Sequence, residues 1–190
     1  MSKDDCLVEV KALYAGYARP VVGPVSLSVR RGDVVGIRGP NGAGKSTLLN
    51  AIAASARIFS GRVEKRPGLR VSHQQQSALP LDDVPLSGHE LLGLTGASSE
   101  SLPAWIKPHV KRRLDRLSGG QLQFLHVWAC LTAPVDLVLL DEPTNNVDPP
   151  GVEQMAEELT RMRASRAAMV ISHDRHFLER ICTRVVDLPQ

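Results

Sequence analysis

Nine consecutive residues, Gly39 to Thr47, restrict the possible folds of this chain more than any other stretch. They read GPNGAGKST and fit the pattern G-x-x-x-x-G-K-[ST]. An apolar run, GDVVGIRG, leads into the motif, and a run of helical composition, KSTLLNAIAASA, continues from its end. A strand that enters a glycine-rich turn and then a helix is the context in which this motif holds phosphate groups. We therefore expect a nucleotide-binding core that contains both strands and helices.

The residue types in this loop suit the chemistry of phosphate binding. Glycines let backbone N–H groups curve around phosphate oxygens without a Cβ in the way. The helix that follows presents unpaired N–H groups and a partial positive charge to the same anion. Lys45 would contact the β- and γ-phosphates, Ser46 would ligate Mg²⁺, and Thr47 would bond the α-phosphate. The residues expected to contact the nucleotide are Gly39, Pro40, Asn41, Gly42, Ala43, Gly44, Lys45, Ser46 and Thr47.

Two adjacent acids end a second apolar run, LVLLDEP, at residues 137–143. Carboxylates at the end of a buried strand are costly unless they are paired or have a function. With a phosphate loop upstream, Asp141 is expected to hold Mg²⁺, through water, and Glu142 to polarise the attacking water. The pair predicts a site that hydrolyses a nucleoside triphosphate.

Strand and helix patterns alternate along most of the chain. Alternating runs at 6–13 and 24–29 predict half-buried strands, and Ser60-Gly61 and Pro67-Gly68 are read as turns of a further short strand pair. Residues from about 77 to 116 differ, with four prolines and two helical pieces, SGHELLGL and KPHVKRRLDRL. Strand and helix then alternate again from LVLLDEP to RVVDL. The pattern predicts an α/β sheet core with a small, mostly helical insertion.

Composition excludes several classes of protein. The chain has 190 residues and a net charge of +3, and its basic residues form no block, so nucleic-acid binding is not expected. No apolar run approaches the ~20 residues that cross a bilayer. Three cysteines without a C-x-x-C pair predict reduced thiols in a cytosolic protein.

With LSGGQ at residues 117–121 between them, these motifs resemble the ATP-binding cassette (ABC) ATPase family, in the family's order and over nearly the whole chain. The resemblance implies a P-loop NTPase core with a mostly parallel sheet, an N-terminal antiparallel β subdomain and an inserted helical subdomain. It places the nucleotide-binding core at 1–76 and 132–190 and the helical subdomain at about 77–131, within a single domain spanning 1–190.

The resemblance also implies roles for residues outside the phosphate loop and the acidic strand end. Tyr17 matches an aromatic residue that stacks on adenine, and His173 matches a histidine that contacts the γ-phosphate. Gln76, with Gln75 as the alternative, matches a glutamine that contacts Mg²⁺ and the attacking water. Asp148 matches an aspartate that links the two sites of a dimer.

In that family, two cassettes clamp two ATP molecules head to tail, and hydrolysis opens the clamp. The resemblance therefore implies ATP and Mg²⁺ as cofactors and a second copy of the cassette as partner. Each ATP would face the other subunit's LSGGQ, which is represented here by Ser118, Gly119, Gly120 and Gln121.

Three interpretations of the clamp remain open at this point. In the first, the chain is the ATPase subunit of a transporter, peripheral on the inner face of the cell membrane and bound to a separate permease. The stretch QSALPLDDVPLS, residues 76–87, is similar to the loop of zinc and manganese importers. In the second, it is a soluble cassette of the ribosome-associated branch, which DEPTNNVD and SHDRHFLER resemble. The third, a hydrolysis-dead regulatory subunit, conflicts with the presence of both Glu142 and His173.

The helix after LSGGQ departs from the family pattern. Arginines that are usual there are replaced by Phe124 and Ala129, and a large Trp128 stands where a small residue is common. None of these residues touches the γ-phosphate in the family scheme, so we expect any effect to lie in how the helical subdomain docks on the core.

Overall fold

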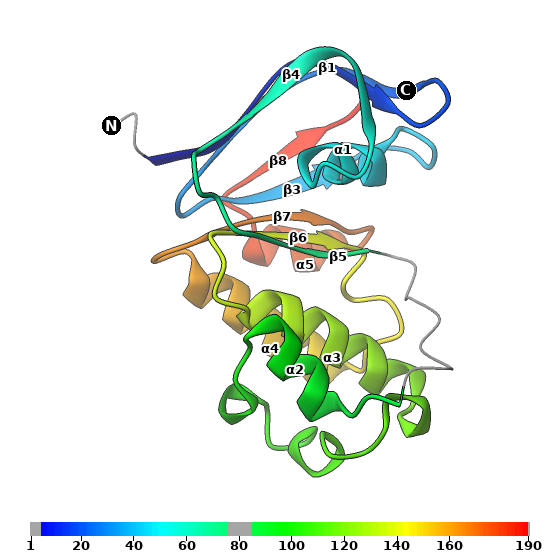
Figure 1. The fold of residues 1–190 in the computed structure, drawn as a ribbon, viewed down its shortest axis with the longest axis vertical. Helices are drawn as coiled ribbons and strands as arrows, with labels where there is room; N and C mark the ends of the chain where they lie inside the picture. The colour runs from blue at the N-terminus through cyan, green and yellow to red at the C-terminus, as the bar shows by residue number, and fades with distance from the viewer. Residues whose placement is uncertain (1–4, 76–84, 190) are drawn as a thin grey trace.

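The computed structural model describes residues 5–75 and 85–189, which form two sheets and five α-helices with bounds that can be given. Figure 1 shows a three-stranded sheet at one end, a five-stranded sheet in the middle and a group of helices at the other end. The sheets account for the mixture of alternating and continuous apolar runs in the sequence.

The first sheet is antiparallel and has the order β2-β1-β4. Its strands are β1 (Cys6–Gly16), β2 (Pro20–Arg30) and β4 (Arg57–Lys65). The prediction of a turn at Ser60-Gly61 is wrong, because Gly61 lies inside β4 opposite an irregularity in β1 near Ala12. A Cβ on Gly61 would lie 2.2 Å from Ala12 O, so the glycine serves a bulge rather than a turn.

The second sheet is parallel throughout and has the order β5-β6-β7-β3-β8. Its strands are β3 (Val34–Arg38), β5 (Val71–Gln74), β6 (Leu137–Asp141), β7 (Ala167–Ile171) and β8 (Arg184–Asp187). Every residue of β6 and β7 is buried, as expected for strands covered on both faces. The predicted α/β class, with a parallel sheet and an N-terminal antiparallel sheet, is confirmed.

The helices cover the parallel sheet on its two faces. Helix α1 (Lys45–Ile52) lies between the two sheets, and α3 (Gly119–Thr132), α4 (Pro149–Met162) and α5 (Arg175–Ile181) lie on the other side (Figure 1). Helix α2 (Gly88–Thr95) packs outside α3. One apolar cluster fills the space between the sheets, and a second joins the lower face of the parallel sheet to the helices.

The segment KPHVKRRLDRL, residues 107–117, does not form the helix that its composition predicts. It contains only short 3-10 turns at Lys107–His109 and Leu114–Arg116. Its backbone bonds to the start of α2 instead: His89 N donates to Val110 O, and Leu114 N donates to Leu86 O, each at 2.8 Å. The segment is therefore a series of turns held against the start of α2.

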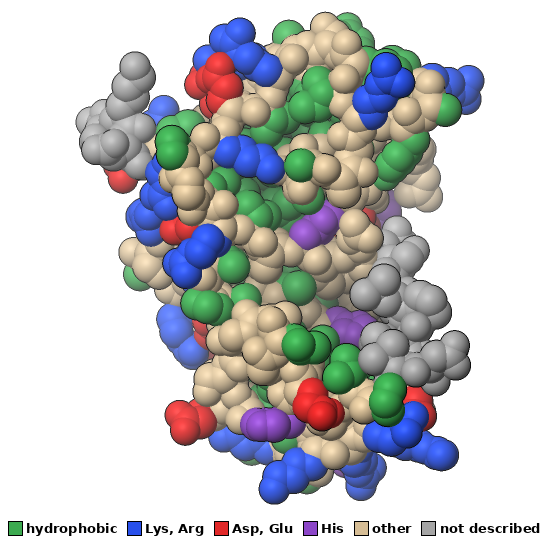
Figure 2. Space-filling view, in the orientation of Figure 1, with side chains coloured by type: hydrophobic (Ala, Val, Ile, Leu, Met, Phe, Trp, Pro, Cys, Tyr) green, Lys and Arg blue, Asp and Glu red, His purple; other side chains and the backbone are tan. Residues whose placement is uncertain are grey.

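Charges are spread over the molecule in both signs. On the face shown in Figure 2, Lys and Arg side chains lie over the sheet end, along one side and over the helical end, with acidic side chains close to them in each of these places. Among the helices of the described ranges, none is both long and apolar enough to cross a bilayer. Burial raises the pKa of Cys130 and of Cys182 to about 11, so both thiols stay protonated at neutral pH.

Candidate functional site

The phosphate loop connects the end of β3 to the start of α1. Gly44 precedes the helix with φ of 84°, in the left-handed region that favours glycine. A Cβ there would also lie 2.5 Å from the Cβ of Val22 in β2. The loop is therefore shaped both by its own backbone and by close contact with the antiparallel sheet.

Lys45 is buried and its side chain turns back over the loop. Its ammonium donates to Gly39 O and to Pro40 O, each at 3.0 Å. These two carbonyl oxygens hold the charge above the concave side of the loop, where a phosphate group would lie.

A cavity of about 460 Å³ opens beside this loop. Four separate parts of the sequence meet in it: the start of β2, the phosphate loop with the start of α1, the acidic end of β6 and the end of β7 with the turn after it. Its lining consists of Val21, Asn41, Gly42, Gly44, Lys45, Ser46, Thr47, Asp141, Glu142, Ile171 and His173. The volume lies within the range of small-molecule sites.

The two acids at the end of β6 are almost fully buried, with Asp141 4% and Glu142 5% exposed. Glu142 has φ of 52°, an uncommon conformation for a residue with a side chain, and its N donates to Ile171 O at 2.9 Å. Its Oε2 accepts a hydrogen bond from His173 N at 3.2 Å. Adjacent strands β6 and β7 thus hold Glu142 and His173 together.

One carboxylate oxygen of Glu142 has no hydrogen bond in the described part of the chain. Oε1 is buried, and His173 Nε2 lies 3.2 Å away without the alignment of a hydrogen bond. A buried acceptor without a donor is costly, so this oxygen is suited to receive a donor from a bound molecule. A water molecule activated by Glu142 would be such a donor.

The donor set also fits a magnesium ion. The hydroxyl of Ser46 and the carboxylate of Asp141 line the same cavity, and oxygen ligands of this kind are those that Mg²⁺ prefers. No group of three or more His, Cys, Asp or Glu side chains that could hold a metal occurs within residues 5–75 and 85–189. The ion would therefore need phosphate oxygens and water to complete its shell.

The residues of LSGGQ lie away from this cavity. Ser118 caps α3: its Oγ accepts from Gln121 N at 3.2 Å, and its N donates to Gln121 Oε1 at 3.1 Å. Gly119 is exposed, and no atom would lie within 4 Å of a Cβ placed on it. The start of α3 therefore presents free N–H groups to the outside rather than to the cavity beside Lys45.

Asp148 and Tyr17 are exposed and do not line the cavity either. Asp148 occupies the N-cap position of α4, but its side chain makes no capping hydrogen bond. The hydroxyl of Tyr17 accepts from Asn50 Nδ2 at 2.7 Å, so the ring lies beside α1.

The predicted Gln76 lies outside the described residues, but the two glutamines before it, Gln74 and Gln75, can be placed. Gln75 donates through Nε2 to Asn50 Oδ1 at 3.3 Å, and Gln74 Oε1 accepts from Asp141 N at 3.2 Å. Asn50 thus contacts both Gln75 and Tyr17. Sequence reasoning missed this residue, although its spacing of four from Ser46 places both on one face of α1.

A second cavity, of about 500 Å³, lies on the other side of Lys45 and was not predicted. Arg38, Arg175 and Asp187 line it with His173, and Arg38 holds Asp187 through two hydrogen bonds of 2.9 and 3.1 Å.

His73 lies elsewhere, on β5. Burial lowers the pKa of His73, while the charge of Asp141 raises it by less. His73 is therefore neutral at pH 7.

Comparison with known proteins places this geometry in a family. Residues 22–145 match the ABC transporter family. The zinc import ATP-binding protein ZnuC of Jannaschia sp. (strain CCS1) is 35% identical over 191 residues, which cover 96% of this chain and 79% of that protein. A solved ATP-binding subunit of an ABC transporter superposes with a TM-score of 0.82 and 24% identity, over 96% of this chain and 85% of that one, and shows the fold alone.

A further solved structure, described as RNase-L Inhibitor, superposes with a TM-score of 0.81 at 26% identity, over 96% of this chain but only 37% of that one. A family match over most of the chain, together with the 35% identity to a full-length relative, decides the assignment. The chain belongs to the ABC transporter family, as an ATP-binding subunit that hydrolyses ATP.

Proposed function

We propose that this chain powers the import of a divalent metal cation, with zinc as the first candidate, through a separate membrane permease. The observation that carries the proposal is the 35% identity to a zinc import ATP-binding protein over 96% of the chain. On this proposal the protein lies in the cytoplasm, peripheral on the inner face of the membrane.

The residues of the main cavity would share the chemistry of hydrolysis. Lys45 contacts the β- and γ-phosphates and Thr47 the α-phosphate, with the loop residues 39–44 around them. Ser46 and Asp141 hold Mg²⁺, together with Gln76 or Gln75, and His173 contacts the γ-phosphate. Glu142 orients the attacking water, and its Oε1, which accepts no hydrogen bond from the described residues, supports that role. Tyr17 stacks on the adenine.

The residues outside the cavity would act on a second copy of the chain. Ser118, Gly119, Gly120 and Gln121 form the outward-facing start of α3, and Asp148 is exposed without a capping bond. In a head-to-tail dimer, both surfaces would close over the neighbour's ATP. The free N–H groups at the start of α3 support this assignment, because they would bind the γ-phosphate.

The dimer is tested with Glu142→Gln. This variant is expected to bind ATP as the native protein does and to lose turnover by roughly a hundredfold or more, because the base for the attacking water is removed. With ATP held unhydrolysed, it should run as a dimer in size-exclusion chromatography. Glu157→Gln, at an exposed position of α4, is the control. A Glu142→Gln protein that stays monomeric at saturating ATP contradicts the proposed clamp.

The transport proposal is tested by purifying the tagged chain with its native partners. Co-purification of an integral membrane permease is expected, and the complex in proteoliposomes should accumulate Zn²⁺ when ATP is supplied to the side that carries the chain. Uptake should disappear with Glu142→Gln, and Mn²⁺ and Mg²⁺ measured in parallel define the selectivity. Recovery of ribosomes instead of a permease would overturn the transport proposal in favour of a soluble cassette.

A further inference from the structure

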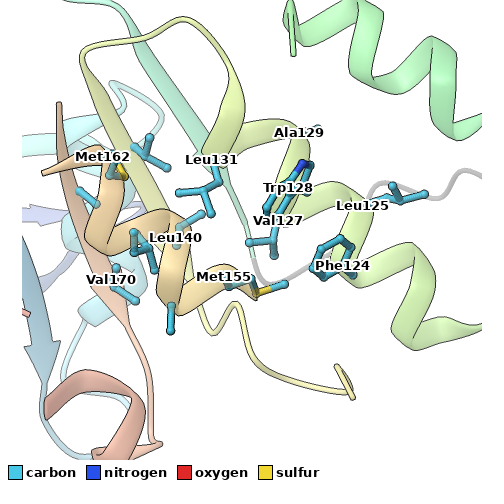
Figure 3. Close-up of a cluster of buried hydrophobic side chains, with 14 of the residues drawn as sticks. Phe124, Leu125, Val127, Trp128, Ala129, Leu131, Leu140, Met155, Met162 and Val170 are labelled. Atoms are coloured by element: carbon cyan, nitrogen blue, oxygen red, sulfur yellow. The ribbon is translucent and has the colours of Figure 1, made fainter. Parts of the chain in front are cut away.

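Phe124 departs from the family pattern, and the structure shows where its ring goes. It lies on α3 one turn after Gly120 and one turn before Trp128, so the three residues share one face of the helix. Its side chain is fully buried. Figure 3 shows the ring pointing toward Met155 of α4, while the neighbouring Leu125 points away from it.

The ring of Phe124 is held between two tryptophans. It meets Trp105 of the insertion edge-on, with centroids 4.7 Å apart and planes at 61°. It stacks on Trp128 with centroids 5.2 Å apart and planes at 21°. Both geometries are favourable for aromatic pairs, so the orientation of Phe124 is strongly restricted from the side of α3 and the insertion.

The same ring also contacts the start of α4. A Cβ on Gly151 would lie 3.1 Å from Phe124, 3.3 Å from Trp105 and 2.7 Å from Val147. One turn nearer the LSGGQ end, a Cβ on Gly120 would lie 2.6 Å from Asn146 O. The face of α3 therefore fits closely against the turn before α4 at Gly120 and against the first turn of α4 at Phe124, and each contact depends on a glycine.

That turn carries residues of both proposed sites. It runs from Glu142 to Asp148 and is closed by bonds from Asn145 N to Glu142 O at 3.3 Å and from Val147 N to Thr144 O at 3.2 Å. Gly151 N donates to Asp148 O at 2.8 Å and joins the turn to α4. A shift of α3 against the start of α4 would therefore move LSGGQ relative to Glu142 and Asp148.

We propose that Phe124 is a positioning residue that fixes α3 to the start of α4 and, through it, to the turn Glu142–Asp148, so that the LSGGQ surface offered to a second copy moves as one unit with the acid of the chain's own site. The proposal rests on the proposed dimer. A positioning role predicts a different result from ordinary core packing. Because no residue of α3 lines the cavity beside Lys45, a change at Phe124 would act on the dimer and not on nucleotide binding. Loss of the contact is expected to spare nucleotide binding to the monomer and to impair closure of the dimer.

The experiment compares Phe124→Leu with Leu125→Ala, both in the Glu142→Gln background. The two residues are adjacent and equally buried, but Leu125 packs toward Gly88 of α2. Both variants remove core volume and are expected to lose stability in urea. ATP affinity of the monomer, measured by titration calorimetry, should stay within about twofold for both, since the changes are remote from the cavity.

The two variants should differ in ATP-dependent dimerisation. Phe124→Leu should raise the dimer dissociation constant, measured by analytical ultracentrifugation, by at least about tenfold, because misplacement of a contacting surface is costly. Leu125→Ala should change it by less than about twofold. Equal effects of the two variants overturn the proposal. If Glu142→Gln alone forms no dimer, the proposed clamp fails first, and the two failures are thus distinguished.

A second variant approaches the contact from α4 and does not depend on the folding of Phe124→Leu. Gly151→Ala adds a methyl group against Phe124, Trp105 and Val147, and it should weaken the dimer as Phe124→Leu does while ATP affinity is kept. Gly93→Ala is its control, because a Cβ there meets no atom within 4 Å. A Gly151→Ala protein that dimerises like Gly93→Ala contradicts the proposal.

Discussion

Among the single residues, Lys45 connects the two cavities of the core. It lines both of them, and its ammonium is held by two carbonyl oxygens of its own loop. An ATP phosphate arriving in the cavity beside Asp141 and Glu142 would meet a charge that is already in place and partly desolvated. Such preorganisation strengthens the attraction between the lysine and the phosphate.

Lys45→Ala is therefore expected to weaken ATP binding by roughly ten- to a hundredfold, the range for a lost hydrogen bond to a charged group. Fluorescence titration with a labelled ATP analogue measures the change. Lys107→Ala, in the exposed 3-10 turn of the insertion, removes the same charge elsewhere and should leave the affinity as it was. An affinity of Lys45→Ala within about twofold of the native value would refute the role of the loop lysine.

Sequence motifs identified single residues of the cavity better than they identified the elements of the fold. Lys45, Ser46, Asp141, Glu142 and His173 are scattered over 129 positions, counted from 45 to 173, yet they line one cavity. Motifs find such residues because their chemistry demands specific side chains. Asn50 has no such signature, since its bonds to Tyr17 and Gln75 depend on how separate segments pack.

At the scale of elements, α2 and α3 begin with the same device. Each starts with a serine that caps the helix and a residue three positions on that bonds back to it: Ser87 with Glu90, and Ser118 with Gln121. The two caps stabilise their helices in the same way. Only the start of α3 is proposed to contact a second ATP. Comparing variants of the two caps therefore separates an effect on helix stability from an effect on ATP turnover.

Ser87→Ala and Ser118→Ala should each lower the free energy of unfolding by about 1 kcal/mol, the usual cost of a lost N-cap. Urea denaturation checks this. Only Ser118→Ala should also reduce ATP turnover, measured as phosphate release at saturating ATP. Equal turnover in the two variants would mean that Ser118 acts as a cap alone.

Elements also show the limits of sequence reasoning. The helical piece SGHELLGL does form α2, but the segment 107–117 was wrongly expected to be helical. Its apolar spacing resembles that of a helix, whereas its backbone bonds to the start of α2. Gly61 was misread for a related reason, since a glycine in a bulge and a glycine in a turn look alike until the partner strand is known.

Across the whole molecule, Arg166 joins the helical side to the sheet. It precedes β7, and its Nη1 donates to Leu131 O at 2.9 Å and to Ala133 O at 3.0 Å at the end of α3. Its Nη2 lies 3.5 Å from Glu158 Oε1 on α4. Burial lowers the pKa of Arg166, and the charge of Glu158 raises it by less. One guanidinium thus joins the start of β7 to two other segments, the end of α3 and α4.

Arg166→Met is expected to lower the free energy of unfolding by about 3 kcal/mol, because it leaves Oε1 of Glu158 and two carbonyl groups without their donor. Arg161→Met removes an arginine that pairs with the same Glu158 but is 72% exposed, and it should cost less than about 1 kcal/mol. Urea denaturation compares the two. Equal losses would show that the bonds to the end of α3 contribute nothing.

The strand order of the parallel sheet determines when the ATP site can exist during protein synthesis. Strand β3 carries the phosphate loop and β6 carries the acids, but the two never pair with each other; β7 lies between them and pairs with both. A nascent chain that has reached Ser165 already contains Lys45 and Glu142, yet it lacks the strand that brings them together. The complete ATP site therefore cannot form before β7 has been made, and until then β3 and β6 each lack a neighbouring strand.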